Sequence, residues 1–211
     1  MKILIVSGGK TPSKELLMEQ VKDSSLILGA DRGCQVLIEN GIFPNYIMGD
    51  FDSIDEEAYK KLRDLKIEMI EFNPEKDFTD SELAFEKAIE LGATEIVLLG
   101  FTGTRLDHVL ANLGLLDKAL ALGIKCEILD DNNRIFLVDK DTILKGKKGQ
   151  TISFNFYNTV VEKFNIRGAK YPLVDYRFDG FTGRTVSNEF IDGDISITFK
   201  SGKILVFYTN D

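Results

Sequence analysis

Apolar residues in the first part of the chain occur in short runs, separated by segments in which they recur at helical spacing. The short runs predict strands at 2–7, 25–30, 46–49, 67–72, 95–100 and 125–129. The helical spacing predicts helices at 80–91, where Thr79 and Glu82 have the form of a capping box, and at 105–122. This alternation predicts an α/β fold, with a Rossmann-like parallel sheet that carries helices on both faces.

The pattern changes after Asp130, where apolar and polar residues begin to alternate one by one. Strands are predicted at 134–139, 150–156, 160–166, 194–200 and 203–208. Ser201 and Gly202 predict a hairpin turn between the last two strands. We therefore expect a domain of residues 1–130 followed by a C-terminal antiparallel β-sandwich domain of residues 131–211.

Composition and charge narrow the function classes. The 211 residues have a net charge of −8, which argues against nucleic acid as a partner. No apolar run approaches the ~18 residues of a membrane span, and the start of the chain lacks the features of a signal peptide. Two cysteines without metal-ligand spacing fit a reducing compartment. We expect a cytoplasmic protein that contacts neither nucleic acid nor membrane.

Aspartates follow the predicted strands of the first domain. They are Asp31 after the second strand, Asp50 and Asp52 after the third, and Asp77 and Asp80 after the fourth. Any one of them could be an ordinary helix N-cap. Asp50 and Asp52 are separated by one residue, however, and cannot both cap the same helix. Since ligands bind at the carboxyl ends of parallel strands, we expect these carboxylates to converge there. Asp50 and Asp52 could share a hard cation such as Mg²⁺, and Asp77 and Asp80 could add to the same site.

The loop after the fifth strand has the composition of a phosphate-binding segment. Gly100 and Gly103 allow a close backbone approach to phosphate oxygens, and Thr102 lies between them. Arg105 follows and can clamp phosphate oxygens through two N–H donors. Two glycines at this spacing are a weak signal on their own. His108, the only histidine, is interpreted as a residue of the first helical turn or the core, and not as a metal ligand.

Taken together, these motifs resemble the motif set of thiamine pyrophosphokinases. The resemblance rests on Gly49-Asp50-Phe51-Asp52-Ser53, on Lys76-Asp77-Phe78-Thr79-Asp80-Ser81-Glu82, on Gly100-x-x-Gly103-x-Arg105-x-Asp107-His108 with Asn112, and on Ser187-Asn188-Glu189. Their order matches as well, and the resemblance covers nearly the whole chain. It implies an enzyme that transfers the diphosphate of ATP to the hydroxyl group of thiamine, giving thiamine diphosphate and AMP.

The resemblance also implies roles for individual residues. Asp50, Asp52 and Asp77 would hold Mg²⁺, with Asp80 close by, and Arg105 and Asp107 would contact the reacting substrates. Asp107 or Asp80 is a candidate for the group that accepts the hydroxyl proton. The candidate residues for binding ATP or thiamine are Asp31, Ser53, Thr79, Gly100, Thr102, Gly103, Arg105, His108, Ser187 and Asn188. The family further implies a homodimer with active sites shared between subunits.

Two departures from the family pattern stand out: Arg32 occupies a position where the family often has glycine, and the chain has no tryptophan to stack on thiamine. Two alternative functions also remain open. A metal-dependent nucleotide phosphohydrolase would use the same aspartates, but it would give no reason for the 100–108 loop or for a second domain. A non-catalytic nucleotide or thiamine sensor would bind without turnover.

Overall fold

The computed structural model describes residues 1–49, 60, 67–71 and 78–210. The chain folds into two compact units, Met1–Asp131 and Asn132–Asp211, which meet one residue beyond the expected boundary. Elements of the first unit are β1 (Lys2–Val6), α1 (Lys14–Asp23), β2 (Leu26–Ala30), α2 (Gly33–Glu39), β3 (Tyr46–Gly49), β4 (Glu68–Glu71), α4 (Asp80–Glu90), β5 (Glu95–Leu99), α5 (Leu106–Ala121) and β6 (Lys125–Leu129). No helix within the described ranges is long and apolar enough to cross a membrane.

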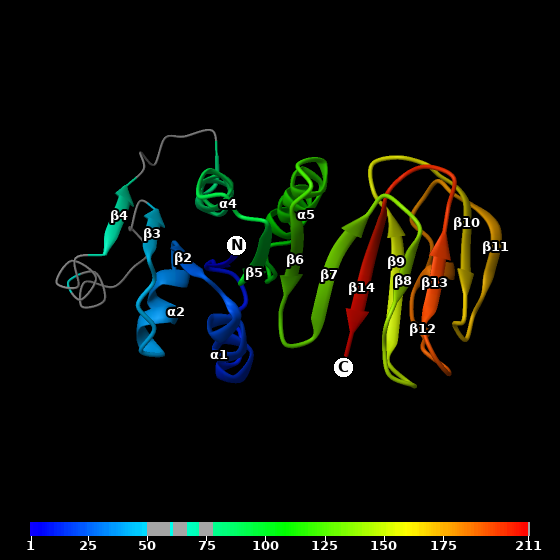
Figure 1. Cartoon of the computed structure of the whole chain (residues 1–211), viewed down its shortest axis with the longest axis horizontal. Helices are drawn as coiled ribbons and strands as arrows, with labels where there is room; N and C mark the ends of the chain where they lie inside the picture. The colour runs from blue at the N-terminus through cyan, green and yellow to red at the C-terminus, as the bar shows by residue number, and fades with distance from the viewer. Residues whose placement is uncertain (50–59, 61–66, 72–77, 211) are drawn as a thin grey trace. The chain divides into compact units, whose positions relative to one another are not determined.

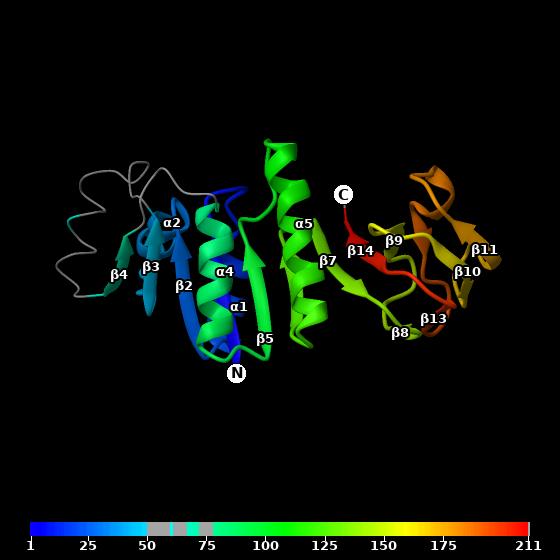
Figure 2. The same ribbon diagram turned by 90° about the horizontal axis from the view of Figure 1, so that it is seen from above.

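The first unit is a parallel sheet covered by helices on both faces, as the sequence predicted. Its strands lie in the order β6-β5-β1-β2-β3-β4, and every neighbouring pair is parallel. Helices α1 and α2 cover one face, and α4 and α5 cover the other (Figures 1 and 2). The central strands β1 and β5 are almost entirely apolar, because both faces of the sheet are buried there.

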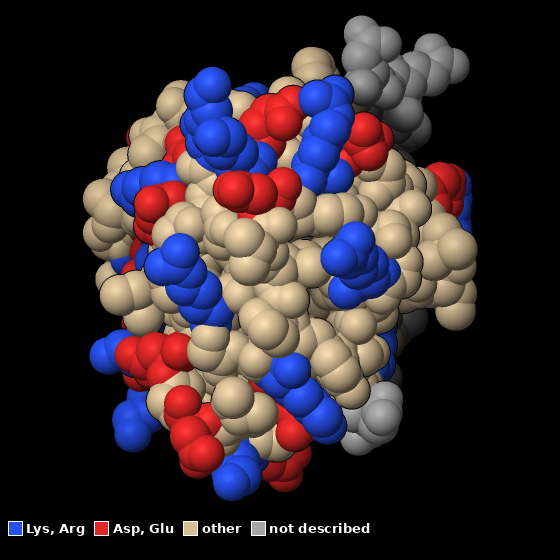
Figure 3. All heavy atoms as spheres, turned by 90° about the vertical axis from the view of Figure 1, so that its right-hand side faces the viewer, with Lys and Arg blue, Asp and Glu red and all other residues tan. Residues whose placement is uncertain are grey.

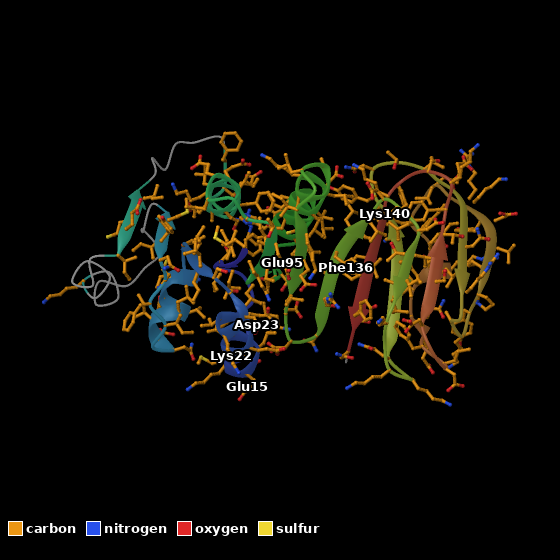
Figure 4. The ribbon with its side chains drawn as sticks, in the orientation of Figure 1. Glu15, Lys22, Asp23, Glu95, Phe136 and Lys140 are labelled. Carbon is orange, nitrogen blue, oxygen red and sulfur yellow. The ribbon has the colours of Figure 1, made fainter. Side chains whose placement is uncertain are left out.

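Local sequence explains where the helices begin and which side they bury. The Ser13 side chain caps α1 by accepting from the Leu16 amide. The predicted capping box of α4 is present: Thr79 Oγ1 accepts from the Glu82 amide at 3.2 Å, and Glu82 Oε2 accepts from the Thr79 amide at 2.9 Å. Polar side chains of α1 such as Glu15 lie at the surface, whereas Leu17 is buried against the sheet (Figure 4).

The second unit is an antiparallel β-sandwich. Its elements are β7 (Asn133–Val138), β8 (Thr142–Leu144), β9 (Thr151–Phe156), β10 (Val161–Arg167), β11 (Leu173–Phe178), η1 (Gly183–Thr185), β12 (Asn188–Glu189), β13 (Ile195–Thr198) and β14 (Ile204–Thr209). One layer has the order β12-β9-β14-β7, and the other has β11-β10-β13-β8. Between them lies one apolar core that includes Phe154, Phe164 and Phe178.

The hairpin predicted at Ser201-Gly202 is wrong. Strand β13 pairs with β10 and β8, whereas β14 pairs with β9 and β7 in the other layer. Both strands bury alternate residues in the same core, Ile195 and Ile197 from one side and Ile204 and Val206 from the other. The chain therefore crosses from one layer to the other at this turn. The alternation of apolar and polar residues is the same whether two successive strands pair in one sheet or lie in opposite layers.

Charged side chains of the second unit neutralise one another at the surface. Arg177 pairs with both Glu162 and Asp179, and Lys170 pairs with Glu189. On the face that Figure 3 shows, Lys and Arg side chains are interspersed with Asp and Glu. A mixed surface of this kind is typical of a globular domain and offers no continuous cationic stripe to a nucleic acid on that face.

Candidate active site

The topology of the first unit indicates a ligand site at the carboxyl end of β1. From β1 the chain proceeds through α1 to β2 on one side, and from β5 it proceeds through α5 to β6 on the other. The direction of the connections therefore reverses between β1 and β5. In open α/β sheets, ligands bind at such a reversal, outside the carboxyl ends of the strands. The loops that follow β1 and β5 are thus the centre of the candidate site.

These two loops are joined backbone to backbone. The Ser7 amide donates to the Leu99 carbonyl at 2.8 Å, the Gly9 amide to Gly100 at 2.8 Å, and the Lys10 amide to Thr102 at 2.6 Å. A Cβ atom on Gly9 would lie 2.2 Å from the Thr102 carbonyl oxygen, and one on Gly100 would lie 2.2 Å from that of Ser7. Only glycine fits at either position. The Ser7-Gly8-Gly9 turn thus lies directly beside the 100–103 loop.

Two aspartates lie near this joined pair of loops. Asp31 follows β2 in a left-handed conformation (φ 51°), and a Cβ on Gly8 would lie 3.0 Å from its Oδ2 atom. Asp80 begins α4, and the next residue, Ser81, hydrogen-bonds with Ser7 through the two hydroxyls at 2.7 Å. Both carboxylates act on the buried Cys34 thiol: burial is the main reason that its pKa rises to about 12, and the negative charges of Asp31 and Asp80 raise it further. Asp31 thus lies beside Gly8, and Asp80 precedes a residue that contacts Ser7.

The three predicted metal ligands, Asp50, Asp52 and Asp77, lie outside the described residues, and so does Ser53. Among the residues that are described, no group of three or more His, Cys, Asp or Glu side chains could hold a metal ion. The magnesium site therefore remains a prediction from the sequence.

The 100–103 loop is hydrogen-bonded to two side chains outside it, those of Asn112 and Asp130. Phe101 is buried, and its carbonyl accepts from the Asn112 side-chain amide at 2.8 Å. The Thr102 hydroxyl donates to Asp130 Oδ2 at 2.8 Å. Asn112 belongs to the family motif, but Asp130 was not among the predicted site residues. A signal for it was present, because Asp130 follows the sixth strand just as the predicted aspartates follow theirs.

Arg105 and Asp107 pair with each other at the start of α5. Arg105 Nη2 lies 2.6 Å from Asp107 Oδ2, and its Nε lies 3.3 Å from Oδ1, a two-point contact between exposed side chains. This hydrogen bond raises the pKa of Arg105 and lowers that of Asp107. His108, the next residue, is also exposed. The pair lies in the segment that continues from the 100–103 loop, where the guanidinium can exchange its partner for a phosphate.

In the second unit, Asn188 and Ser187 differ sharply in environment. The Asn188 side chain is buried, accepts from the amides of Tyr171 and Glu189, and donates to the Tyr171 carbonyl at 2.8 Å. Ser187 is exposed, has a left-handed backbone (φ 56°), and donates its amide to Ser153 Oγ. Asn188 thus fixes the backbone of Tyr171, a half-exposed aromatic residue that was not among the predicted site residues.

Comparisons with known proteins match both units. The family model "Thiamin pyrophosphokinase, catalytic domain" matches residues 17–128, and "Thiamin pyrophosphokinase, vitamin B1 binding domain" matches residues 140–204. The thiamine pyrophosphokinase of Bacillus subtilis is 31% identical over 211 residues, 99% of each chain.

Solved structures agree with this match. The crystal structure of thiamine pyrophosphokinase from Bacillus subtilis has a TM-score of 0.90 at 29% identity and covers all of both chains. That from Geobacillus thermodenitrificans has a TM-score of 0.86 at 31% identity and covers 100% of this chain and 98% of its own. Yeast thiamin pyrophosphokinase has the same fold, with a TM-score of 0.84 at 20% identity over 99% of this chain and 86% of its own. The chain therefore belongs to the thiamine pyrophosphokinase family.

Proposed function

We propose that this protein transfers the diphosphate of ATP to the hydroxyl group of thiamine, giving thiamine diphosphate and AMP. The observation that carries the proposal is the pair of joined glycine loops at the reversal between β1 and β5, with Asp31 and Asp80 beside them. Glycines have no side chain and let a polyphosphate approach the backbone closely, and carboxylates at the same edge suit the cation that accompanies it.

Mg²⁺ fits the donor set of this edge, because its preferred ligands are carboxylate oxygens. Asp50, Asp52 and Asp77 would hold the ion, and Asp80 would lie close to it. When bound, Mg²⁺ neutralises charge on the phosphate oxygens and removes the repulsion among the aspartates. The remaining contacts to ATP or thiamine are assigned to Asp31, Ser53, Thr79, Gly100, Thr102, Gly103 and His108.

The reaction needs an in-line approach of the thiamine hydroxyl oxygen to the β-phosphorus of ATP. The bond from that phosphorus to the oxygen of the α-phosphate breaks, AMP leaves, and the hydroxyl proton passes to a base. Arg105 would stabilise the charge that spreads over the phosphate oxygens. Asp80 and Asp107 are the two candidates for this base, and Asp107 becomes available once Arg105 contacts phosphate instead of its carboxylate.

The second unit would hold thiamine, which is cationic and aromatic. With no tryptophan in the chain, we assign the stacking role to Tyr171, because Asn188 fixes its backbone and its side chain is 56% exposed. The exposed Ser187 hydroxyl would add a polar contact. In this proposal Asn188 does not contact thiamine itself but positions Tyr171 through hydrogen bonds to its backbone.

We also propose a cytoplasmic homodimer in which the second unit of one subunit completes the site of its partner. Leu106 and Leu110 on α5 support an interface, since they are 72% and 66% exposed and lie one helical turn apart.

Product identification tests the proposed function. Incubation with ATP, Mg²⁺ and thiamine should give AMP and thiamine diphosphate in equal amounts, and no AMP should form when thiamine is left out. Phosphate released without thiamine would identify a hydrolase instead. Binding of ATP or thiamine without any turnover would identify a sensor.

A further inference from the structure

A lysine outside the family motifs lies at the joined loops. Lys10 follows Gly9 in the loop after β1, and its Nζ atom lies 3.8 Å from Oδ1 of Asp130 at the end of β6. The Lys10 side chain is 43% exposed, whereas that of Asp130 is 3% exposed. A buried carboxylate is therefore oriented toward an ammonium group that reaches solvent.

The same carboxylate holds the loop after β5. Asp130 Oδ2 accepts from the Thr102 hydroxyl at 2.8 Å, and the Thr102 carbonyl accepts from the Lys10 amide at 2.6 Å. Lys10, Thr102 and Asp130 thus connect the loops that follow β1, β5 and β6 in one closed set of contacts. A buried carboxylate is costly unless it is paired and hydrogen-bonded. The set therefore fixes where the ammonium group lies.

Charge explains why a cation is needed at this point. Residues 1–130 contain 14 Lys and Arg against 24 Asp and Glu, so their net charge is 14 − 24 = −10. ATP is itself a polyanion, and its phosphates would be bound among these carboxylates, where Arg105 in the loop after β5 contributes one positive charge. An ammonium group has three N–H donors and can contact a carboxylate and phosphate oxygens together.

We infer that Lys10 binds the phosphates of the nucleotide, and that Asp130 is a positioning residue that holds both the Lys10 ammonium and the Thr102 loop. The inference rests on the proposed function in one respect only, the identity of ATP as the nucleotide. Lys10 would thus be a cationic ligand, and Asp130 its positioning residue, in a site whose motif residues are mostly acidic.

Binding of a non-transferable nucleotide tests the role of Lys10 apart from turnover. The probe is α,β-methylene ATP, in which the bond broken in the reaction is replaced, measured by calorimetry with Mg²⁺ and without thiamine. Lys10→Met should weaken binding about 10-fold or more, because a charge-assisted contact is lost. Lys14→Met is the matched control: Lys14 is exposed on α1, and its loss changes the net charge equally. Equal effects of the two variants would overturn the assignment.

A double-mutant cycle tests the role of Asp130. Asp130→Asn keeps an oxygen that can accept from Thr102 but removes the charge that holds Lys10. It should raise the KM for ATP several-fold and leave the KM for thiamine unchanged. In the Lys10→Met background it should cause no further loss of analogue affinity, whereas a purely additive loss would contradict the positioning role.

The remaining outcomes are also decisive. If Asp130→Asn does not fold, as judged by thermal unfolding, the comparison of Lys10→Met with Lys14→Met decides the inference. If the wild-type protein makes no thiamine diphosphate but its analogue binding still depends on Lys10, the inference stands and the proposed function fails.

Discussion

Asn188 and Ser187 are neighbours in sequence, yet their side chains have different roles. The Asn188 side chain makes three hydrogen bonds in a buried position, and Ser187 is exposed to solvent. The resemblance alone placed both near thiamine without distinguishing them. Their burial distinguishes them. Removing the buried Asn188 side chain would leave its hydrogen-bond partners unsatisfied, whereas removing the exposed Ser187 hydroxyl would not.

This difference predicts opposite behaviour of two alanine variants. Asn188→Ala should lower the free energy of unfolding by about 1–3 kcal/mol, since the Tyr171 amide and carbonyl lose their partner. Ser187→Ala should leave stability unchanged and raise the KM for thiamine more than that for ATP. Urea unfolding and steady-state kinetics check the pair. Equal loss of stability in both variants would show that Ser187 is structural.

Cys34 offers a second residue-scale test. Burial, with smaller contributions from Asp31 and Asp80, raises the pKa of its thiol to about 12, so the thiol stays protonated at pH 7. Iodoacetamide should modify the native protein very slowly and should modify both cysteines after denaturation. Rapid labelling of Cys34 in the native protein would contradict its burial.

The same shift has a consequence for stability. Because the folded pKa is raised, the unfolded chain releases its proton first, and the stabilisation is lost as pH rises from about 8.5 towards 12. Cys34→Ala should therefore have a shallower alkaline decline in the free energy of unfolding than the wild-type protein. Parallel declines would show that another group is responsible.

At the scale of elements, the joined loops after β1 and β5 leave no room for a side chain at Gly9 or Gly100. Gly100 and Gly123 have nearly the same left-handed backbone, with φ of 74° and 72°. A Cβ on Gly100 would lie 2.2 Å from the Ser7 carbonyl oxygen, whereas a Cβ on Gly123 would meet nothing within 4 Å. A side chain at Gly123 would therefore cause backbone strain alone, whereas one at Gly100 would cause the same strain and steric overlap as well.

Alanine substitution at these two glycines measures the cost of strain and the cost of steric overlap. Gly123→Ala should cost about 1 kcal/mol from strain alone. Gly100→Ala should cost at least about 1–3 kcal/mol more, because the loops must move apart, and it should also weaken nucleotide binding. Thermal unfolding and calorimetry with the nucleotide analogue check both effects. Similar stability losses for the two variants would mean that the loops separate easily.

Elements with a regular pattern were predictable from sequence, and those with an irregular pattern were not. Strands β1 and β5 and helix α4 lie within one residue of their predicted ends, because continuous apolar runs and a capping box mark them. Strand β11 was missed. Asp175 interrupts its alternation with a left-handed backbone, and the register shifts along its pairing with β10.

The candidate site was predictable where its chemistry lies in motifs. Asp31 lies beside Gly8, and Asp80 precedes Ser81, which hydrogen-bonds with Ser7, so the positions of both agree with the rule for strand ends. Lys10, Asp130 and Tyr171 could not be found in this way, because their importance depends on contacts between segments far apart in sequence. Pairing of β13 and β14 with different layers depends on such distant contacts as well.

At the scale of the whole molecule, the proposed reaction is divided between two units. The first unit carries the carboxylates and the glycine loops, and the second carries Tyr171 and Ser187, so neither unit is expected to work alone. The central claim is that these two sets of residues form one site across a homodimer.

Activity of hybrid dimers tests that claim most directly. Asp52→Asn should abolish Mg²⁺-dependent formation of thiamine diphosphate, and so should the double variant Tyr171→Ala, Ser187→Ala, with each protein remaining folded. After the two are mixed and subunit exchange is demonstrated by mass spectrometry, about one quarter of the wild-type activity should return. Half of the randomly formed dimers would be hybrids, and each hybrid would hold one intact site of two. No recovery despite complete exchange would contradict the shared site and would place both sets of residues within a single chain.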